Sequence, residues 1–233
     1  MDSRLLLDLV PCPSAQAVPG LDEFVVVAFN DLAGTYRLLR EIDDPQAVRT
    51  YAAEYTWCGF EEVEGPIQIT TVSKGSSIHV SLVSVSAKIA SGKAPHFAVS
   101  LARFLHKHGA KRVLVVAAVD VASHPSKPHF FSLNGYPAEA NLPVLKTSAD
   151  VNDHTALHIV QALETQGLQV GGLILPTKRE RPSARYGTEE IRQFSDSLCQ
   201  LLGLSFSAES AAATPVVQSS YSTDDSKYDR MYL

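Results

Sequence analysis

Two histidines, His154 and His158, stand four residues apart in a segment whose apolar spacing predicts a helix. At that spacing both imidazoles share one face, where they could bind a metal ion together with Asp150 or Asp153. The glutamate of the H-E-x-x-H pattern is missing, however, and no third ligand follows at a suitable spacing. Asp150 and Asn152 are explained as helix-start residues. We therefore predict a helix start here and no metal site.

The second place that could do chemistry is Asp120, which directly follows an apolar run at 112–119 that predicts a buried strand. Ligands of open α/β sheets bind beyond the carboxyl ends of strands, so Asp120 and His124 could line a small-molecule site. That site would make the chain a phosphorylase-like or hydrolase-like enzyme. An aspartate that starts a turn explains the same residue without any ligand.

The sequence contains none of the motifs that mark common catalytic or cofactor sites. It has no G-x-S-x-G nucleophile elbow, no Walker loop and no G-x-G-x-x-G fingerprint. Gly171 and Gly172 begin an apolar strand and have no phosphate-loop context. We therefore expect no catalytic residue, no cofactor and no metal, and the enzyme with a site near Asp120 stays as the alternative.

The elements that would position these residues follow from the apolar pattern. Strands are predicted at 24–29, 67–72, 78–85, 112–119 and 171–175, and a glycine-containing loop joins the second and third as a hairpin. Helices are predicted at 44–55, which opens with Asp44-Pro45, and at 94–108, 152–166 and 188–202. Residues 34–42 favour neither type, and the proline-rich stretch 120–150 predicts a long insertion of the kind that is often functional. The order of elements predicts a three-layer αβα domain.

The composition is that of an ordinary globular protein with one domain. The 233 residues are 45% hydrophobic and 19% charged, and the net charge is −5. No apolar run is long enough for a membrane helix, and no basic stripe indicates a nucleic-acid partner. Three widely spaced cysteines favour a reducing compartment, the cytosol or the nucleus. The basic cluster Lys178, Arg179, Arg181 and Arg185 is a solvated loop or the rim of a partner interface.

The last three residues, Met231, Tyr232 and Leu233, end a polar stretch rich in Ser, Ala, Thr and Asp. Such a stretch buries too little apolar surface to offset its ordering entropy, so we expect a domain at 1–206 and a flexible tail at 207–233. The tip offers an aromatic ring and a free carboxylate, which a lysine or backbone amides could bind. A frayed terminus and a ligand of a PDZ groove are the alternatives.

Several segments resemble the chaperone 1 branch of the proteasome assembly chaperone family. FVVVAFND resembles its first strand, HKHGAKRVLVVAAVD its central helix-to-strand step, and LPVLKTSADVNDHTALHIVQALETQGLQVGGLILPTK a loop followed by a helix and a strand. The terminal Met231-Tyr232-Leu233 matches the hydrophobic-Tyr-any (HbYX) motif of ligands of the proteasome α-ring. The resemblance covers most of residues 20–205 in order and pattern, with low residue identity. The long acidic N-terminal extension of some members has no counterpart, which puts only the function of that extension in doubt.

The resemblance implies a non-enzymatic chaperone of 20S proteasome assembly with a phosphorylase-like fold. It implies a heterodimer with assembly chaperone 2 that binds the outer face of the α-ring. Met231 would pack at the rim of a pocket between α-subunits, Tyr232 would enter the cleft, and the Leu233 carboxylate would pair with a pocket lysine. The surface that meets the partner would be apolar and exposed, with the last helix and the 120–150 insertion as candidates for it.

Overall fold

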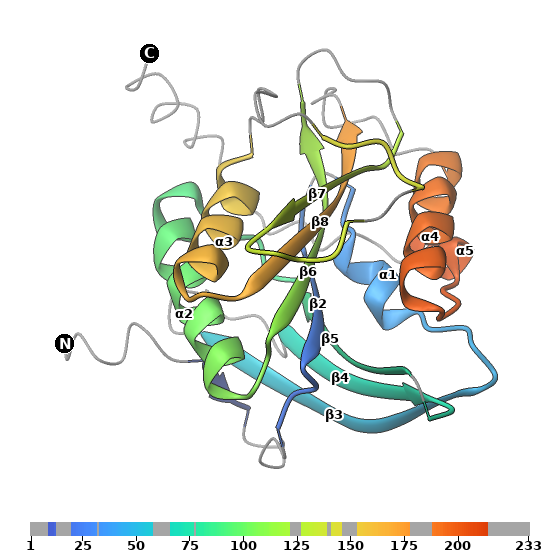
Figure 1. Ribbon diagram of the computed structural model, residues 1–233, viewed down its shortest axis with the longest axis horizontal. Helices are drawn as coiled ribbons and strands as arrows, with labels where there is room; N and C mark the ends of the chain where they lie inside the picture. Colours follow the sequence, from blue (N-terminus) through green and yellow to red (C-terminus); the bar gives the residue numbers. More distant parts are fainter. Residues whose placement is uncertain are drawn as a thin grey trace.

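A mixed β-sheet runs through the chain and is covered by helices on both faces (Figure 1). The computed structural model describes residues 9–12, 20–31, 33–57, 66–76, 78–121, 127–138, 141–145, 153–177 and 188–213. Within these residues the sheet has eight strands in the order β1-β3-β4-β5-β2-β6-β8-β7. The central strands β5, β2, β6 and β8 are parallel, and antiparallel strands flank them on both sides.

The central strands are apolar almost throughout because both of their faces are covered. In β2, for example, Val25, Val26 and Val27 are fully buried although their side chains alternate between the two faces. The strand bounds are β1 Leu9–Pro11, β2 Phe24–Phe29, β3 Ala47–Trp57, β4 Ile67–Lys74, β5 Ile78–Val85, β6 Arg112–Asp120, β7 His129–Leu133 and β8 Gln169–Thr177.

The helices form two layers with a hydrophobic core under each (Figure 1). The helices α2 (Ala94–Lys107) and α3 (His154–Thr165) cover one face, and a 3-10 turn, η2 (Ser91–Lys93), precedes α2. The other face is covered by α1 (Tyr36–Arg40), α4 (Thr188–Leu202) and α5 (Ala208–Ala213). The predicted three-layer αβα arrangement is confirmed. In the part of the chain that the structure describes, no helix has the length and apolar character that crossing a membrane requires.

The central elements lie where the sequence predicts them. The strands β2, β6 and β8 and the helices α2, α3 and α4 match the predicted segments to within a few residues. The predicted hairpin is formed by β4 and β5, with Ile69 opposite Val83. Its loop turns at Gly75, whose φ of 61° lies in the left-handed region that glycine adopts without steric cost.

The helix predicted at 44–55 is wrong, because this segment enters β3 and pairs antiparallel with β4. The Asp44 side chain does accept a hydrogen bond from the backbone N–H of Gln46 at 3.0 Å, but it forms a turn and not a helix cap. Further along, Tyr55 and Trp57 point into the core beneath α2. Alternate aromatic side chains on one face suit a half-buried strand, and this pairing outweighs the helix-start signal.

Several observed elements lie outside the predicted set. The short helix α1 occupies the unassigned stretch 34–42, and β1 adds a short antiparallel strand beside β3. Inside the 120–150 insertion, β7 pairs with β8 and also forms a bridge between Phe130 and Val144. The helix α5 follows the predicted domain boundary at 206, and its Ala211 is buried. The packed domain therefore extends to Ala213.

Candidate functional site

The carboxyl ends of the parallel strands form the edge at which the sequence predicts a small-molecule site. Asp120 is the last residue of β6 and is half-buried opposite Thr177, at the end of β8. The hydroxyl of Thr177 donates to the carbonyl of Val119 at 3.3 Å. His124, the partner expected for Asp120, lies outside the described residues. Asp120 therefore lies at the carboxyl-end edge of the sheet, as predicted. In the described part of the chain, no other residue of the predicted small-molecule site lies beside it.

The neighbouring strand end carries a carboxylate that the sequence reasoning did not single out. Asp31 follows β2, and its Oδ1 accepts hydrogen bonds from the backbone N–H groups of Ala33 and Thr35, both at 3.0 Å. Its Oδ2 accepts from the Thr35 hydroxyl at 2.6 Å and from the N–H of Ala118, in β6, at 2.7 Å. These donors converge on one carboxylate and tie the ends of β2 and β6 together.

Burial and hydrogen bonding act in opposite directions on Asp31. Burial penalises the charged form most and raises the pKa of Asp31 from 3.8 to about 6, while the hydrogen bonds from Thr35, Ala118 and Ala33 oppose this rise. A carboxyl group with a raised pKa at the strand ends is a common feature of active sites. Here, however, the hydrogen bonds to the carboxylate come from groups of the chain itself, as in a structural turn.

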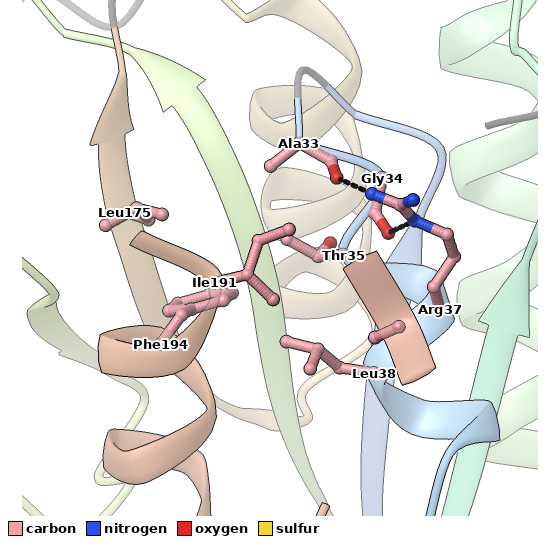
Figure 2. Close-up of a pocket in the computed structure, with 9 residues that line it drawn as sticks. Ala33, Gly34, Thr35, Arg37, Leu38, Leu175, Ile191 and Phe194 are labelled. Atoms are coloured by element: carbon pink, nitrogen blue, oxygen red, sulfur yellow. Dashed lines mark hydrogen bonds between the residues drawn. The ribbon is translucent and has the colours of Figure 1, made fainter. Parts of the chain in front are cut away.

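Arg37, in the first turn of α1, closes the same loop (Figure 2). Its Nη2 donates to the carbonyl of Ala33 at 2.7 Å, and its Nε donates to the carbonyl of Gly34 at 3.1 Å. Beside this loop, Ile191 and Phe194 of α4 line a cavity of about 10 Å³. A space of this size holds about one water molecule at most, so it is a packing gap between helices rather than a substrate pocket.

The side chains of Asp31, Thr35 and Arg37 therefore shape the turn from β2 into α1. Asp31 and Arg37 bind backbone groups of the loop, and the Thr35 hydroxyl binds the Asp31 carboxylate. Asp31 and Thr35 also contact the backbone of β6. The pattern that singles out Asp120, an acid directly after a buried strand, also marks Asp31 in FVVVAFND. The hydrogen bonds that the Asp31 carboxylate accepts from the loop and from β6 show that Asp31 forms a turn; the sequence pattern alone does not distinguish this from a ligand site.

The histidine pair lies on α3 as predicted. His154 is exposed and His158 is half-buried, and the described residues hold no group of three potential metal ligands. The helix starts at Asp153, whose side chain accepts a hydrogen bond from the N–H of Ala156 at 2.9 Å. The N-cap of α3 is therefore Asp153, whereas the prediction names Asp150 and Asn152 as the helix-start residues. Asp150 and Asn152 lie outside the described residues.

Gly171 and Gly172 have a packing role in β8. A Cβ atom at Gly171 would stand 2.7 Å from the ring of Tyr136, and one at Gly172 would stand still closer to the ring of Phe131. Both rings come from β7 and the turn that follows it. The two glycines let these rings approach the strand backbone, which explains their presence without any phosphate.

The residues predicted to bind the α-ring, Met231, Tyr232 and Leu233, lie outside the described residues, as does the basic cluster at 178–185. The two candidates for an exposed apolar partner surface, the last predicted helix and the 120–150 insertion, are partly described, so the exposure of their apolar residues can be compared. The helix α4 turns its apolar residues Ile191, Phe194 and Leu198 into the core. In the 120–150 insertion, by contrast, Val144 beside β7 is 71% exposed.

Comparison with known proteins finds likeness in fold and not in sequence. No protein-family model matches the chain, and no curated protein matches it. PbaB of Pyrococcus furiosus, an archaeal proteasome activator, shares the fold with a TM-score of 0.57 at 9% identity, over 87% of this chain and 91% of that one. PbaA of the same organism, an archaeal homolog of proteasome-assembly chaperone, gives 0.55 at 13% identity, over 84% and 88%.

A third solved structure with this fold is a proteasome-assembly chaperone homologue from Mycobacterium tuberculosis. It gives a TM-score of 0.51 at 16% identity and covers 82% of this chain and 89% of that one. At such identities these matches show a shared architecture, the mixed sheet between two helical layers, and nothing finer.

Proposed function

We propose that this chain is a non-enzymatic chaperone of 20S proteasome assembly, of the chaperone 1 type, that acts in the cytoplasm and the nucleus. The observation that carries the proposal is the shared fold. Over more than four fifths of both chains, the domain has the architecture of PbaA and of the Mycobacterium tuberculosis protein, and both are named as homologues of assembly chaperones. The terminal Met231-Tyr232-Leu233 adds support from an independent part of the sequence.

In this proposal the domain pairs with assembly chaperone 2 and lies on the outer face of the α-ring. The tail carries the second contact: Met231 packs at the pocket rim, Tyr232 enters the cleft between α-subunits, and the Leu233 carboxylate pairs with a lysine. The sequence predicts a flexible chain of about 20 residues beyond Ala213, and a flexible chain of that length has an average span of roughly 22–27 Å. Tethering raises the effective concentration of the tip at the pocket, so a weak tip still contributes to binding.

The test is binding of the purified heterodimer to 20S particles. We compare the full chain, a chain lacking Met231 to Leu233, and a chain extended by one glycine, which moves the free carboxylate away from Leu233. Both changed chains are expected to keep the heterodimer and to lose much of the particle binding. Unchanged particle binding in both would contradict the tail assignment. Failure of the full chain to pair with assembly chaperone 2 or to bind α-subunits would contradict the chaperone proposal as a whole.

A further inference from the structure

The helix α2 exposes two cations and contains no acidic residue, although the chain as a whole is acidic. No aspartate or glutamate occurs between Glu64 and Asp120, although the net charge of the chain is −5. Within this stretch, α2 exposes Arg103 and Lys107, and neither forms an ion pair with any residue that the structure describes. These two cations are therefore open to a partner that carries negative charge.

A groove of about 210 Å³ separates the exposed surfaces of α2 and α3. Pro95 and Val99 of α2 and Ala162 of α3 supply its apolar part. The α3 side adds hydrogen-bonding groups from Gln161 and Gln166. Apolar contact combined with a few polar groups is what a groove needs to bind an amphipathic protein segment.

The two cations lie further along α2 than the groove and do not line it. Pro95, Val99, Arg103 and Lys107 follow one another at intervals of four residues, so each lies about one turn further along α2 and about 40° further round its axis. A segment that places an apolar side chain between Val99 and Ala162 would bring its next residues toward Arg103 and Lys107. Negative charge in that part of the segment would be attracted by these two cations.

We propose that the α2–α3 groove is a docking site for an acidic segment of a partner protein, anchored by an apolar side chain. Charge complementarity sets the sign of the partner, and the apolar groove favours a polypeptide over a nucleic acid, whose phosphates gain nothing from Pro95 and Val99. The site depends neither on the tail nor on pairing with a second chaperone. The chain's own residues 214–233 contain Asp224, Asp225 and Asp229, but they follow α5, which packs on the opposite face of the sheet.

The test is a selection of displayed random 16-residue peptides on the full chain at about 0.15 M salt, where long-range attraction is screened. We expect enriched peptides that place carboxylates beside an apolar residue. Their binding should slow hydrogen exchange at 95–107 and 158–166. In the variant Arg103→Glu/Lys107→Glu, their affinity should fall by about tenfold or more, since reversal replaces two attractions by repulsions. Both positions are exposed, so this variant is expected to fold.

A matched control carries the same charge change elsewhere. Lys88→Glu/Lys127→Glu reverses two exposed cations that do not lie on α2 and do not line the groove, and should alter the affinity less than about twofold. The proposal is overturned if no acidic peptide is enriched, or if the enriched peptides bind both double variants equally well. Equal binding of a single-stranded oligonucleotide or of anionic vesicles would also overturn it. The proposal would also be overturned if residues 214–233 of the chain itself protect the groove. In that case, deleting residues 214–233 would make hydrogen exchange at 158–166 faster.

Discussion

The carboxylate of Asp31, just after β2, accepts a 2.7 Å hydrogen bond from the backbone N–H of Ala118 in β6. Changing Asp31 to Asn should destabilise the fold, because the amide nitrogen that replaces one oxygen cannot accept from the N–H groups that meet the carboxylate. A buried donor left without a partner costs about 1–3 kcal/mol. Urea unfolding at neutral pH measures this loss. Asp22→Asn is a matched control with a smaller expected loss. Among the described residues, the Asp22 carboxylate accepts from the Ser81 hydroxyl alone, which can also rotate to suit an amide.

The raised pKa of Asp31 predicts a particular pH dependence. Since the pKa is about 6 in the folded chain and near 3.8 when unfolded, the folded state holds this proton more tightly. The proton-linked part of the contribution of Asp31 to stability is therefore complete below pH 3.8 and is lost as the pH rises through 6, a change of about 3 kcal/mol. The hydrogen bonds to the ionised carboxylate are the part that remains at neutral pH. The loss of unfolding free energy on Asp31→Asn should therefore be larger at pH 4 than at pH 7, by about 2–3 kcal/mol. A difference that does not vary with pH would show that the pKa is not raised.

The packing of Phe131 on Gly172 predicts a loss of stability when a methyl group is added. Gly172→Ala places a Cβ against the Phe131 ring, and such overpacking costs about 1–3 kcal/mol. Thermal unfolding measures the loss, and the double variant Gly172→Ala/Phe131→Leu should recover part of it. Gly92→Ala is the matched control, since a Cβ at Gly92 meets nothing within 4 Å. Equal stability of the two single variants would contradict the packing role.

Lys74 connects the β4–β5 hairpin to the end of α4. Its Nζ donates to Asp44 Oδ2 at 2.8 Å and to the carbonyl of Gly203 at 2.9 Å. The hydrogen bond from Lys74 is the main reason that the pKa of Asp44 is lowered, so this ion pair contributes stability above pH 3.8 and loses it as the pH falls further. In Lys74→Met the pKa of Asp44, followed by NMR of its carboxyl carbon, should rise toward 3.8. Amide exchange at Ser205, whose N–H donates to Asp44 Oδ2 at 3.2 Å, should also become faster.

The sequence is sufficient to predict the central part of the fold. A continuous apolar run such as that of β6 is best explained by a strand covered on both faces. The apolar stripe of Phe97, Leu101 and Leu105 in α2 indicates a helix with one buried face just as specifically. The edges of the sheet are harder to predict. The segment 44–55 opens with a helix-start signal, and only its pairing with β4 shows that it is a strand. The residues of β7 lie between prolines, and their pairing with β8 depends on Gly171 and Gly172 far along the chain.

The candidate sites show the same limit. One pattern, an acid after a buried strand, marks both Asp31 and Asp120, and only the donors around Asp31 reveal a turn-forming carboxylate. The N-cap of α3 is a local signal and was predictable to within one residue. The α2–α3 groove depends on two helices distant in sequence, so no single segment indicates it.

Tyr232 provides the sharpest test of the proposed tail function. In the α-ring proposal its ring enters a cleft, so Tyr232→Ala should weaken binding of the purified heterodimer to 20S particles by roughly tenfold or more, a loss typical of an aromatic residue at an interface hot spot. Tyr232→Phe keeps the apolar ring and should lose less. Tyr228→Ala, four residues upstream in the same tail, is the matched control and should bind as the wild type does. If the tail instead enters a PDZ groove, Leu233→Ala abolishes binding to that partner while Tyr232→Ala has little effect, because strand addition of that kind reads the last residue and the one two before it.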